Sequence, residues 1–225
     1  RKIQAALGEG MHGKRLFLIL EGLTRLRQAA VEPRLLPGVA DDAMDSRRGQ
    51  DQESAKLGAL GEMVPEIVNT GHRVLIFSQF VSLLTQVRDW ASRERLGYCY
   101  LDGSMSPGRR KEEIRRFQED GGPPLFIISL RAGGVGINLT AADYVILLDP
   151  WWNPAVEDQA IDRSHRIGQT QPVTAYRLIA SDTVEERIAA LQARKKALAG
   201  DLVPDESAVI SSLSEEEILD LFAPS

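Results

Sequence analysis

The sequence predicts an α/β fold in which a parallel sheet is covered by helices on both faces. From residue 54 onward, short apolar runs alternate with amphipathic helical segments, which is the order of βαβ units. The runs are continuously apolar, as expected for strands that are buried on both faces. Right-handed crossovers would bring the loops that follow the strands to one edge, where sheets of this kind bind their ligands.

Local signals predict where the strands and helices lie. The strands are expected at residues 74–77, 98–101, 125–128, 144–148 and 173–179. The helices are expected at residues 54–69, 80–93, 106–117, from 153 onward, and at 183–199. Ser54 and Ser106 are typical N-cap residues, Gly71 is typical of a helix end, and Thr183 to Glu186 has the form of a capping box.

Helical extensions are predicted on both sides of this domain. Residues 1–53 are interpreted as a helical segment that breaks between Gly8 and Gly13, followed by a loop from residue 31. The sheet domain is expected to occupy residues 54–199, and residues 200–225 are expected to form a tail. Within the tail, Ser214-Glu-Glu-Glu217 predicts a short capped helix that either packs back on the domain or docks another domain.

Composition limits the class of protein. The chain has 225 residues, of which 43% are hydrophobic, and a net charge of −5. No apolar run approaches the roughly 20 residues that span a bilayer, and the single cysteine, Cys99, permits no internal disulfide. The three histidines lack the spacing of metal ligands, so no metal site is expected. The negative charge argues against a nucleic-acid binder, but Arg109 to Lys111 and Arg163 to Arg166 could form a local positive strip.

The segment Gly8 to Arg15 is similar to the phosphate-binding loop of ATPases but departs from it. Arg15 occupies the position of the magnesium-binding Ser or Thr, and no apolar strand precedes the segment. We interpret it as a loop that joins two helices. The sequence offers no other cradle for the β- and γ-phosphates and no acidic pair after a strand, so any ATP site in this chain is expected to be half a site.

Gln159, Arg163 and Arg166 form the first candidate site. They are spaced by four and three residues on the helix predicted from Pro154, so their side chains are expected on one helix face. Two guanidinium groups and an amide on one stripe suit phosphate oxygens. The alternative is an ordinary solvated helix face.

Two further motifs follow predicted strands. In Ser129 to Leu139, three glycines in four residues could expose successive N–H groups to an anion, or could simply form a tight turn. In Asp149 to Pro154, two adjacent tryptophans point in different directions, so one can fill the core while the other faces a partner. The alternative is that both tryptophans pack in the core.

Together these motifs resemble the carboxy-terminal RecA-like lobe of the Swi/Snf family of superfamily-two DNA translocases. The matching segments run in the expected order, at residues 23–35, 74–80, 101–117, 129–139, 152–169 and 182–186. The Trp152-Asn-Pro154 block and the Arg166-Ile-Gly-Gln169 ending separate this family from the DEAD-box RNA helicases. The resemblance implies a RecA-like parallel sheet, with residues 1–53 leading in from a first lobe that this chain lacks.

In this family two such lobes enclose ATP with Mg²⁺, and the first lobe carries the phosphate loop and the metal-binding acids. By resemblance Arg166 is the arginine finger, Arg163 is its neighbour, and Gln159 orients the two. A guanidinium aimed at the γ-phosphate increases the rate by about 10³–10⁵ in such enzymes. The resemblance places three further residues on the nucleotide side, namely Gly134, Gly136 and Asn138.

The resemblance also implies double-stranded DNA as a partner, held by its backbone without sequence readout. The residues that match DNA-contacting positions are Ser78, Gln79, Gly103, Ser104, Ser129, Arg131, Trp152 and Asn153. Trp152 is expected to face a DNA groove and Trp151 to fill the core. With the first lobe, the chain is expected to move directionally on duplex DNA, with a DNA-bound protein as a further partner.

The lobe alone is expected to bind DNA and nucleotide weakly and to hydrolyse no ATP. Two other interpretations stay open: a catalytically inert nucleic-acid-binding module, and a structural interaction domain held by its terminal helices. The alanine- and arginine-rich composition favours a bacterial source, and hence the cytoplasm and its nucleoid. A eukaryotic source would place the protein in the nucleus.

Overall fold

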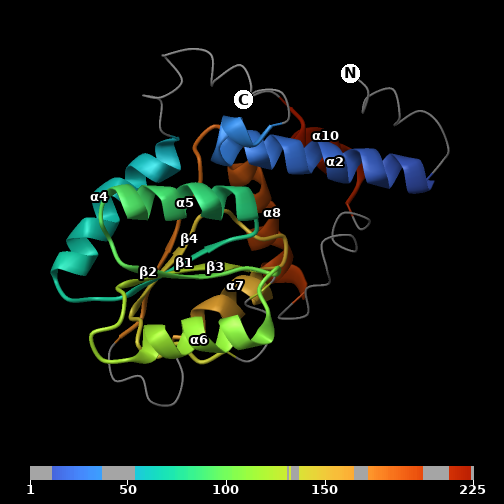
Figure 1. Cartoon of the computed structure of the whole chain (residues 1–225). Helices are drawn as coiled ribbons and strands as arrows, with labels where there is room; N and C mark the ends of the chain where they lie inside the picture. Colours follow the sequence, from blue (N-terminus) through green and yellow to red (C-terminus); the bar gives the residue numbers. More distant parts are fainter. Residues whose placement is uncertain are drawn as a thin grey trace, which may run out of the picture. The chain divides into compact units, whose positions relative to one another are not determined.

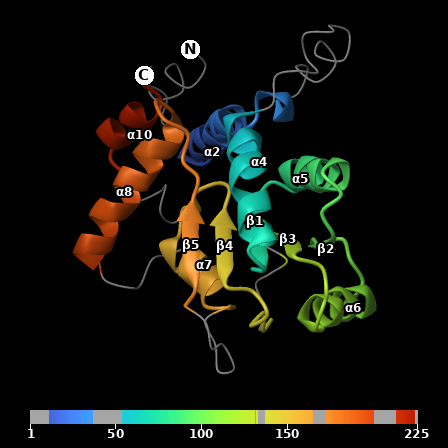
Figure 2. The ribbon, with the colours of Figure 1, turned by 90° about the vertical axis from the view of Figure 1, so that its left-hand side faces the viewer.

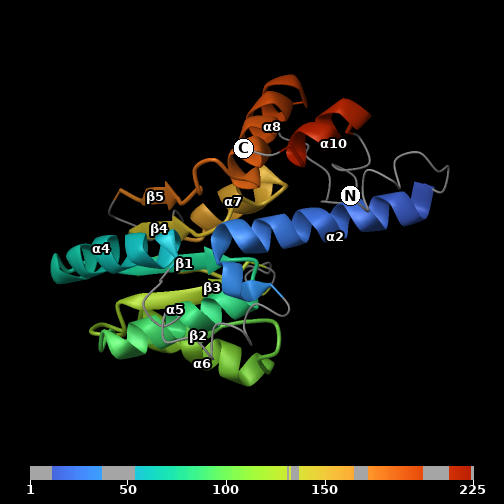
Figure 3. The same ribbon diagram turned by 90° about the horizontal axis from the view of Figure 1, so that it is seen from above.

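The computed structural model describes residues 12–36, 54–130, 132, 137–164, 172–199 and 213–223. The chain forms two compact units. The sheet unit comprises Gln52–Trp151 and Val156–Ile179. The helical unit comprises Arg1–Asp51, Trp152–Ala155 and Ala180–Ser225. Figures 1 to 3 show the helices and strands of both units.

Five parallel strands form the centre of the sheet unit, in the order β2-β3-β1-β4-β5. Their bounds are β1 Val74–Ser78, β2 Tyr98–Leu101, β3 Leu125–Ser129, β4 Tyr144–Leu147 and β5 Thr174–Arg177. Val74 of β1 lies in register with Leu125 of β3 and with Tyr144 of β4. The predicted parallel α/β sheet is confirmed, although β5 is shorter than predicted.

Helices cover both faces of this sheet. α4 (Ala55–Asn69) and α5 (Val81–Arg93) lie over one face, and α6 (Pro107–Gln118) and α7 (Pro154–Ile161) lie over the other (Figure 1). The predicted N-caps are present, since Ser54 and Ser106 each accept the N–H of the residue three positions on, at 3.2 and 3.4 Å. Gly71, at φ +88°, makes the left-handed turn after α4, a backbone conformation that glycine adopts without steric cost.

Alternate residues of each strand point to opposite faces, which divides the core into two layers. On the side of α6 and α7, Phe117 and Ala160 pack against buried residues from four strands. These are Leu75, Phe77, Cys99, Leu101, Phe126, Ile128, Val145 and Leu147. The intervening residues, which include Val74, Ile76 and Ile127, are equally buried and therefore face α4 and α5. Burial on both faces explains why the strands are continuously apolar.

The helical unit contains α2 (His12–Val31), the short 3₁₀ helix η1 (Pro33–Leu35), α8 (Val184–Ala199) and α10 (Glu215–Leu221). α8 contacts both α2 and α10, and Figures 2 and 3 show α10 beside α8. Ile188 and Leu191 of α8 share one apolar cluster with Leu23 of α2. α8 therefore groups with these helices, whereas we expected it to close the sheet domain at residue 199.

Two boundaries of the helical unit differ from expectation. His12 to Arg15 already belong to α2, so this end of the phosphate-loop lookalike is helix rather than a joining loop. At the start of α8, the Glu186 carboxylate accepts the N–H of Asp182 at 2.9 Å. The predicted capping box, in which Glu186 would accept the N–H of Thr183, is therefore not formed. The capping box predicted for the tail is present, with Ser214 and Glu217 bonded reciprocally at the start of α10.

Candidate functional site

The carboxyl ends of β1, β3 and β4 lie side by side at one edge of the sheet. Ser78 at the end of β1 is in register with Ser129 at the end of β3. Beyond the strands, the N–H of Leu130 donates to the Ser78 carbonyl and the N–H of Leu148 donates to the Phe77 carbonyl, both at 2.9 Å. The loops that carry several predicted motifs therefore start from one edge, as expected for a parallel sheet.

Asp149 organises this edge from a position just beyond β4. Its carboxylate accepts hydrogen bonds from the Ser78 hydroxyl, from the Gln79 backbone N–H at 3.3 Å and from the Gln79 side-chain amide. Ser78 Oγ in turn accepts the N–H of Phe80 at 3.0 Å. Asp149 is only 1% exposed. Sequence reasoning missed it as a site residue, although an acid that directly follows an apolar strand was a signal for it.

This network changes the expected role of the two serines. The Ser78 side chain is fully buried and its hydroxyl proton is donated to Asp149, and Ser129 is buried as well. This burial argues against contact with DNA through either hydroxyl, whereas contact through their backbone stays a prediction. Gln79 is partly exposed, and its amide nitrogen carries a second N–H beyond the one given to Asp149.

Gly103 and Ser104 lie in an exposed loop after β2. Asp102 fixes this loop, since it accepts the N–H and the hydroxyl of Ser104 at 2.8 and 2.6 Å and the hydroxyl of Tyr100 at 3.0 Å. Burial alone would raise the pKa of Asp102, but the bonds from Ser104 and Tyr100 outweigh it and hold that pKa below its usual value. Burial and the contact with Asp102 raise the pKa of Tyr100 to about 12.

Helix α7 ends before Arg163. Residues 162–164 form a turn, and the hydroxyl of Ser164 donates to the Ile161 carbonyl at 2.8 Å, which occupies an acceptor at the helix end. Gln159 is exposed, whereas Arg163 is 4% exposed. The prediction that the two share one helix face is therefore wrong. Arg166 lies outside the described residues.

The turn at Arg163 is joined to the end of the glycine-rich motif. The Arg163 carbonyl accepts the N–H of Leu139 at 3.0 Å. The neighbouring Asn138 has an exposed side chain, and its carbonyl accepts the side-chain amide of Gln118 at 3.1 Å. The residue directly after Asn138, which was predicted for the nucleotide side, is thus bonded to the turn at Arg163, which was predicted for the finger site. The other motif residues, Gly134, Gly136 and Arg131, lie outside the described residues.

Glu157 is a second buried acid that the sequence did not reveal. Its carboxylate accepts the backbone N–H of Trp151 at 2.7 Å and the Nε–H of Arg177 at 2.6 Å. Burial raises the pKa of Glu157 even though both hydrogen bonds favour its charged form. Within the sheet unit, this carboxylate joins α7 to β5 and to the backbone before the helix.

Asn153 and the tryptophans complete the motif. Asn153 Oδ1 accepts the N–H of Ala155 at 2.9 Å, which caps the predicted start of α7. Trp152 is 2% exposed and belongs to the core of the helical unit, where the Arg27 guanidinium lies 5.7 Å from its ring centroid. Trp151 is only partly buried, against the core of the sheet unit. The expectation that Trp152 faces outward is therefore wrong here, whereas Trp151 packs against a core as expected, although it is only partly buried.

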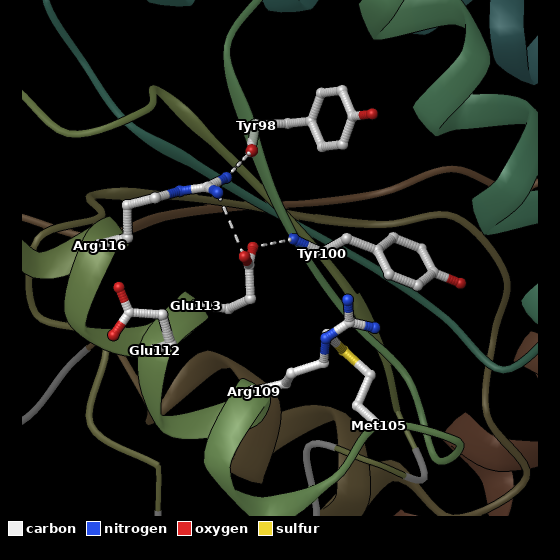
Figure 4. A pocket seen from close by; sticks show the side chains of 7 residues that line it. All are labelled: Tyr98, Tyr100, Met105, Arg109, Glu112, Glu113 and Arg116. Atoms are coloured by element: carbon white, nitrogen blue, oxygen red, sulfur yellow. Dashed lines mark hydrogen bonds and ion pairs between the residues drawn. The ribbon is translucent and has the colours of Figure 1, made fainter.

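A groove runs along β2, the strand at one end of the sheet (Figure 4). It is lined by Tyr98, Tyr100, Met105, Arg109, Glu112, Glu113 and Arg116. Figure 4 shows Arg116 donating to the Tyr98 carbonyl and Glu113 accepting the Tyr100 N–H, the latter at 2.9 Å. These backbone groups would otherwise be open to another strand. The groove is thus the capped edge of the sheet.

The part of the chain that the structure describes has no helix with the length and apolar character to cross a membrane. The same residues contain no group of three or more His, Cys, Asp and Glu side chains that could hold a metal ion.

Known proteins are similar to this chain in sequence. A family model, the helicase conserved C-terminal domain, matches residues 55–168. An uncharacterized ATP-dependent helicase of Mycoplasma pneumoniae is 37% identical over 93% of this chain and 19% of its own length. The lymphoid-specific helicase of Homo sapiens is 45% identical over 64% of this chain and 17% of its own length. The chain thus spans less than a fifth of these curated relatives.

Solved structures share the fold. The SWI2/SNF2 ATPase core of Sulfolobus solfataricus in complex with double-stranded DNA matches with a TM-score of 0.76 and 32% identity, over 99% of this chain and 46% of that chain. The SWI2/SNF2 ATPase C-terminal domain of the same organism matches with a TM-score of 0.72 and 33% identity, over 94% of this chain and 84% of that chain. These matches confirm the RecA-like fold. The chain belongs to the helicase conserved C-terminal domain family, in the form found in SWI2/SNF2 ATPases.

Proposed function

We propose that this chain is the second motor lobe of an ATP-driven translocase on double-stranded DNA, and that it is inactive without the first lobe. The hydrogen bond between Leu139 and the Arg163 carbonyl carries the proposal, because it joins the glycine-rich motif to the turn that leads toward Arg166. Relatives named as helicases support ATP as a ligand, and a related core solved with double-stranded DNA supports DNA as a partner.

The nucleotide in this proposal is ATP with Mg²⁺, shared with the first lobe. Bound ATP would supply a γ-phosphate that is transferred to water. Arg163, Arg166 and Gln159 would hold negative charge on the phosphate side, and the exposed side chain of Asn138 has an amide that suits a polar ligand. We assign the Mg²⁺ ligands to the first lobe, because the described residues of this chain offer no cluster of metal ligands.

The DNA backbone in this proposal is held by loops at the carboxyl edge of the sheet unit. Gln79, Gly103 and Ser104 keep this role, since each lies at least partly exposed after a strand. Ser104 gives its own donors to Asp102, so the backbone N–H of Gly103 is the better phosphate donor of that loop. Asn153 and Arg131 remain proposed contacts from the other two motifs, whereas the burial of Ser78, Ser129 and Trp152 argues against direct contact by their side chains.

The test uses the full-length protein that contains this chain. We expect duplex DNA to stimulate ATP hydrolysis by the wild type, and Arg166→Ala to lower the stimulated rate by about 10³-fold. Arg115→Ala is the matched control, because Arg115 is exposed on α6 and its ion pairs among the described residues are with Glu112 on that helix and with Glu119 directly after it. A stimulated rate within about threefold of wild type in Arg166→Ala would remove the arginine finger from the proposal.

An inert nucleic-acid-binding module is the second candidate function. The burial of Arg163 favours it, because a 4% exposed guanidinium is already enclosed by its own lobe. This candidate predicts DNA binding without any DNA-stimulated hydrolysis in the full-length wild type. The same assay therefore separates the two functions. A structural interaction domain would show neither activity.

A further inference from the structure

Asp149 is placed by the register of the sheet to receive three donors from two consecutive residues at the end of β1, Ser78 and Gln79. Phe77 of β1 pairs with Leu147 of β4, so Gln79 and Asp149 stand opposite each other two residues beyond that pair. The Ser78 hydroxyl, the Gln79 backbone N–H and the Gln79 amide all point to the Asp149 carboxylate. A carboxylate suits this position because it only accepts, whereas an asparagine would turn its own N–H groups toward one of the donors.

The network determines where Gln79 points. Its backbone N–H and its side-chain amide both bond to the same buried carboxylate, so both ends of the residue are fixed. Ser78 extends the network to the N–H of Phe80, which directly precedes α5. A side chain that is already ordered loses less conformational entropy when it binds a ligand than a freely rotating one does.

We infer that Asp149 is a positioning residue for DNA binding, which holds Gln79 so that the second N–H of its amide meets the DNA backbone. This inference rests on the proposed function, in which Gln79 is a backbone contact. Asp149 is 1% exposed, so it acts through Gln79 and does not itself touch a phosphate. The sequence alone assigned it no role.

The test is a titration of the full-length protein with duplex DNA, with ATP hydrolysis as the readout. We expect Asp149→Asn to raise the DNA concentration for half-maximal stimulation by about tenfold, because a hydrogen bond to a charged group contributes about that much. The rate at saturating DNA should stay within about twofold of wild type, since the loop still binds when DNA is in excess. Gln79→Ala should have an effect of similar size.

The double variant Asp149→Asn with Gln79→Ala identifies the route of action. If Asp149 acts through Gln79, the double variant binds DNA no more weakly than Gln79→Ala alone. Asp143→Asn is the matched control, because Asp143 lies at the other end of β4 and accepts hydrogen bonds from His72 and from the Arg73 N–H. It should leave the dependence on DNA concentration unchanged.

Melting temperatures of all variants show whether the fold is retained. If Asp149→Asn does not fold, Ser78→Ala removes one donor from the same carboxylate, and we expect it to raise the half-maximal DNA concentration by about threefold. The inference is overturned if the single effects multiply in the double variant, or if only the rate at saturating DNA falls. It is also overturned if Asp143→Asn acts like Asp149→Asn. Where Ser78→Ala replaces an Asp149→Asn variant that does not fold, an unchanged half-maximal DNA concentration overturns it too. A wild type without DNA stimulation would instead overturn the proposed function.

Discussion

At the scale of single residues, Glu157 shows how burial competes with pairing. Desolvation raises the pKa of this carboxyl above its ordinary value of 4.5, although Trp151 and Arg177 both donate to it. The folded chain therefore holds the proton more tightly than the unfolded chain does. The stability gained from this group is present below the unfolded pKa and is lost as the pH rises through the folded pKa.

Glu157→Gln is expected to remove this pH dependence, because glutamine stays neutral at every pH. The melting temperature of the wild type, measured relative to that of the variant, should fall as the pH rises above 4.5 through the raised pKa. Parallel thermal melts of both proteins over a pH series test this. A difference that grows with pH would mean that the ion pair with Arg177 outweighs the burial of the carboxylate.

Trp152 is the second residue whose environment predicts the effect of a substitution. Its ring is enclosed by the core of the helical unit, so Trp152→Ala should cost about 3–5 kcal/mol of stability in that unit. Denaturant unfolding followed by circular dichroism measures the loss. Phe17→Ala is the control, since Phe17 lies on α2 in the same unit and is 66% exposed. A Trp152→Ala variant as stable as Phe17→Ala would mean that the ring is free to face a partner.

At the scale of elements, β2 is an edge strand that is protected by side chains of α6. Glu113 and Arg116 occupy the outward N–H of Tyr100 and the outward carbonyl of Tyr98. Removing both caps by Glu113→Ala with Arg116→Ala should leave the edge open and promote association between molecules. Sedimentation velocity over a concentration series measures this. The control is Glu112→Ala with Arg115→Ala, which removes an exposed ion pair on the same helix. This variant should associate no more than the wild type does.

Elements whose boundaries depend on local chemistry could be read from the sequence. Ser54 and Ser106 cap helices where predicted, because the N-cap bond involves residues only three positions apart. The end of α7 could not be read in this way, since the hydroxyl of Ser164 and the contact between Arg163 and Leu139 compete with a continued helix. The first of these is local but ambiguous, and the second joins residues far apart in sequence.

The dependence on contacts between distant residues also explains which parts of the candidate site could be predicted from the sequence. The right-handed crossovers expected in a parallel sheet predicted that the motifs share one edge, but the choice of donors there was not predictable. Ser78 and Ser129 were expected to contact DNA because they match DNA-contacting positions of the family that the sequence resembles, yet both are buried. Glu157 looked like an ordinary acid, and the position of Asp149 after an apolar strand was a signal that named no partner; only their burial beside specific donors reveals what they bind.

At the scale of the whole molecule, the chain divides near the predicted boundary at residue 54 but also at two points that the sequence does not indicate. Residues Trp152–Ala155 belong to the helical unit, although their neighbours on both sides belong to the sheet unit. No glycine-rich or charged linker marks either point. The division follows from long-range packing of Trp152 with α2 and α8, which a single sequence does not display.

Charge is the other property that belongs to the whole molecule. A chain with a net charge of −5 can hold DNA only through local positive groups. Arg109 and Lys111 are exposed in α6, in the turns that follow the loop of Gly103 and Ser104. Each cation that neutralises a phosphate adds about 0.9 to the slope of log affinity against log salt concentration.

Replacing both cations with alanine should therefore reduce that slope by about 1.8 in the full-length protein, as two phosphate contacts would. Fluorescence anisotropy titrations with labelled duplex DNA at several salt concentrations measure it. Arg95→Asn is the control, because Arg95 precedes β2 and so lies near the amino ends of the strands, away from the loop of Gly103 and Ser104. Asparagine tolerates the left-handed backbone of this position, at φ 57°. An equal slope in wild type and the double variant would place the DNA away from α6, whatever the change in affinity.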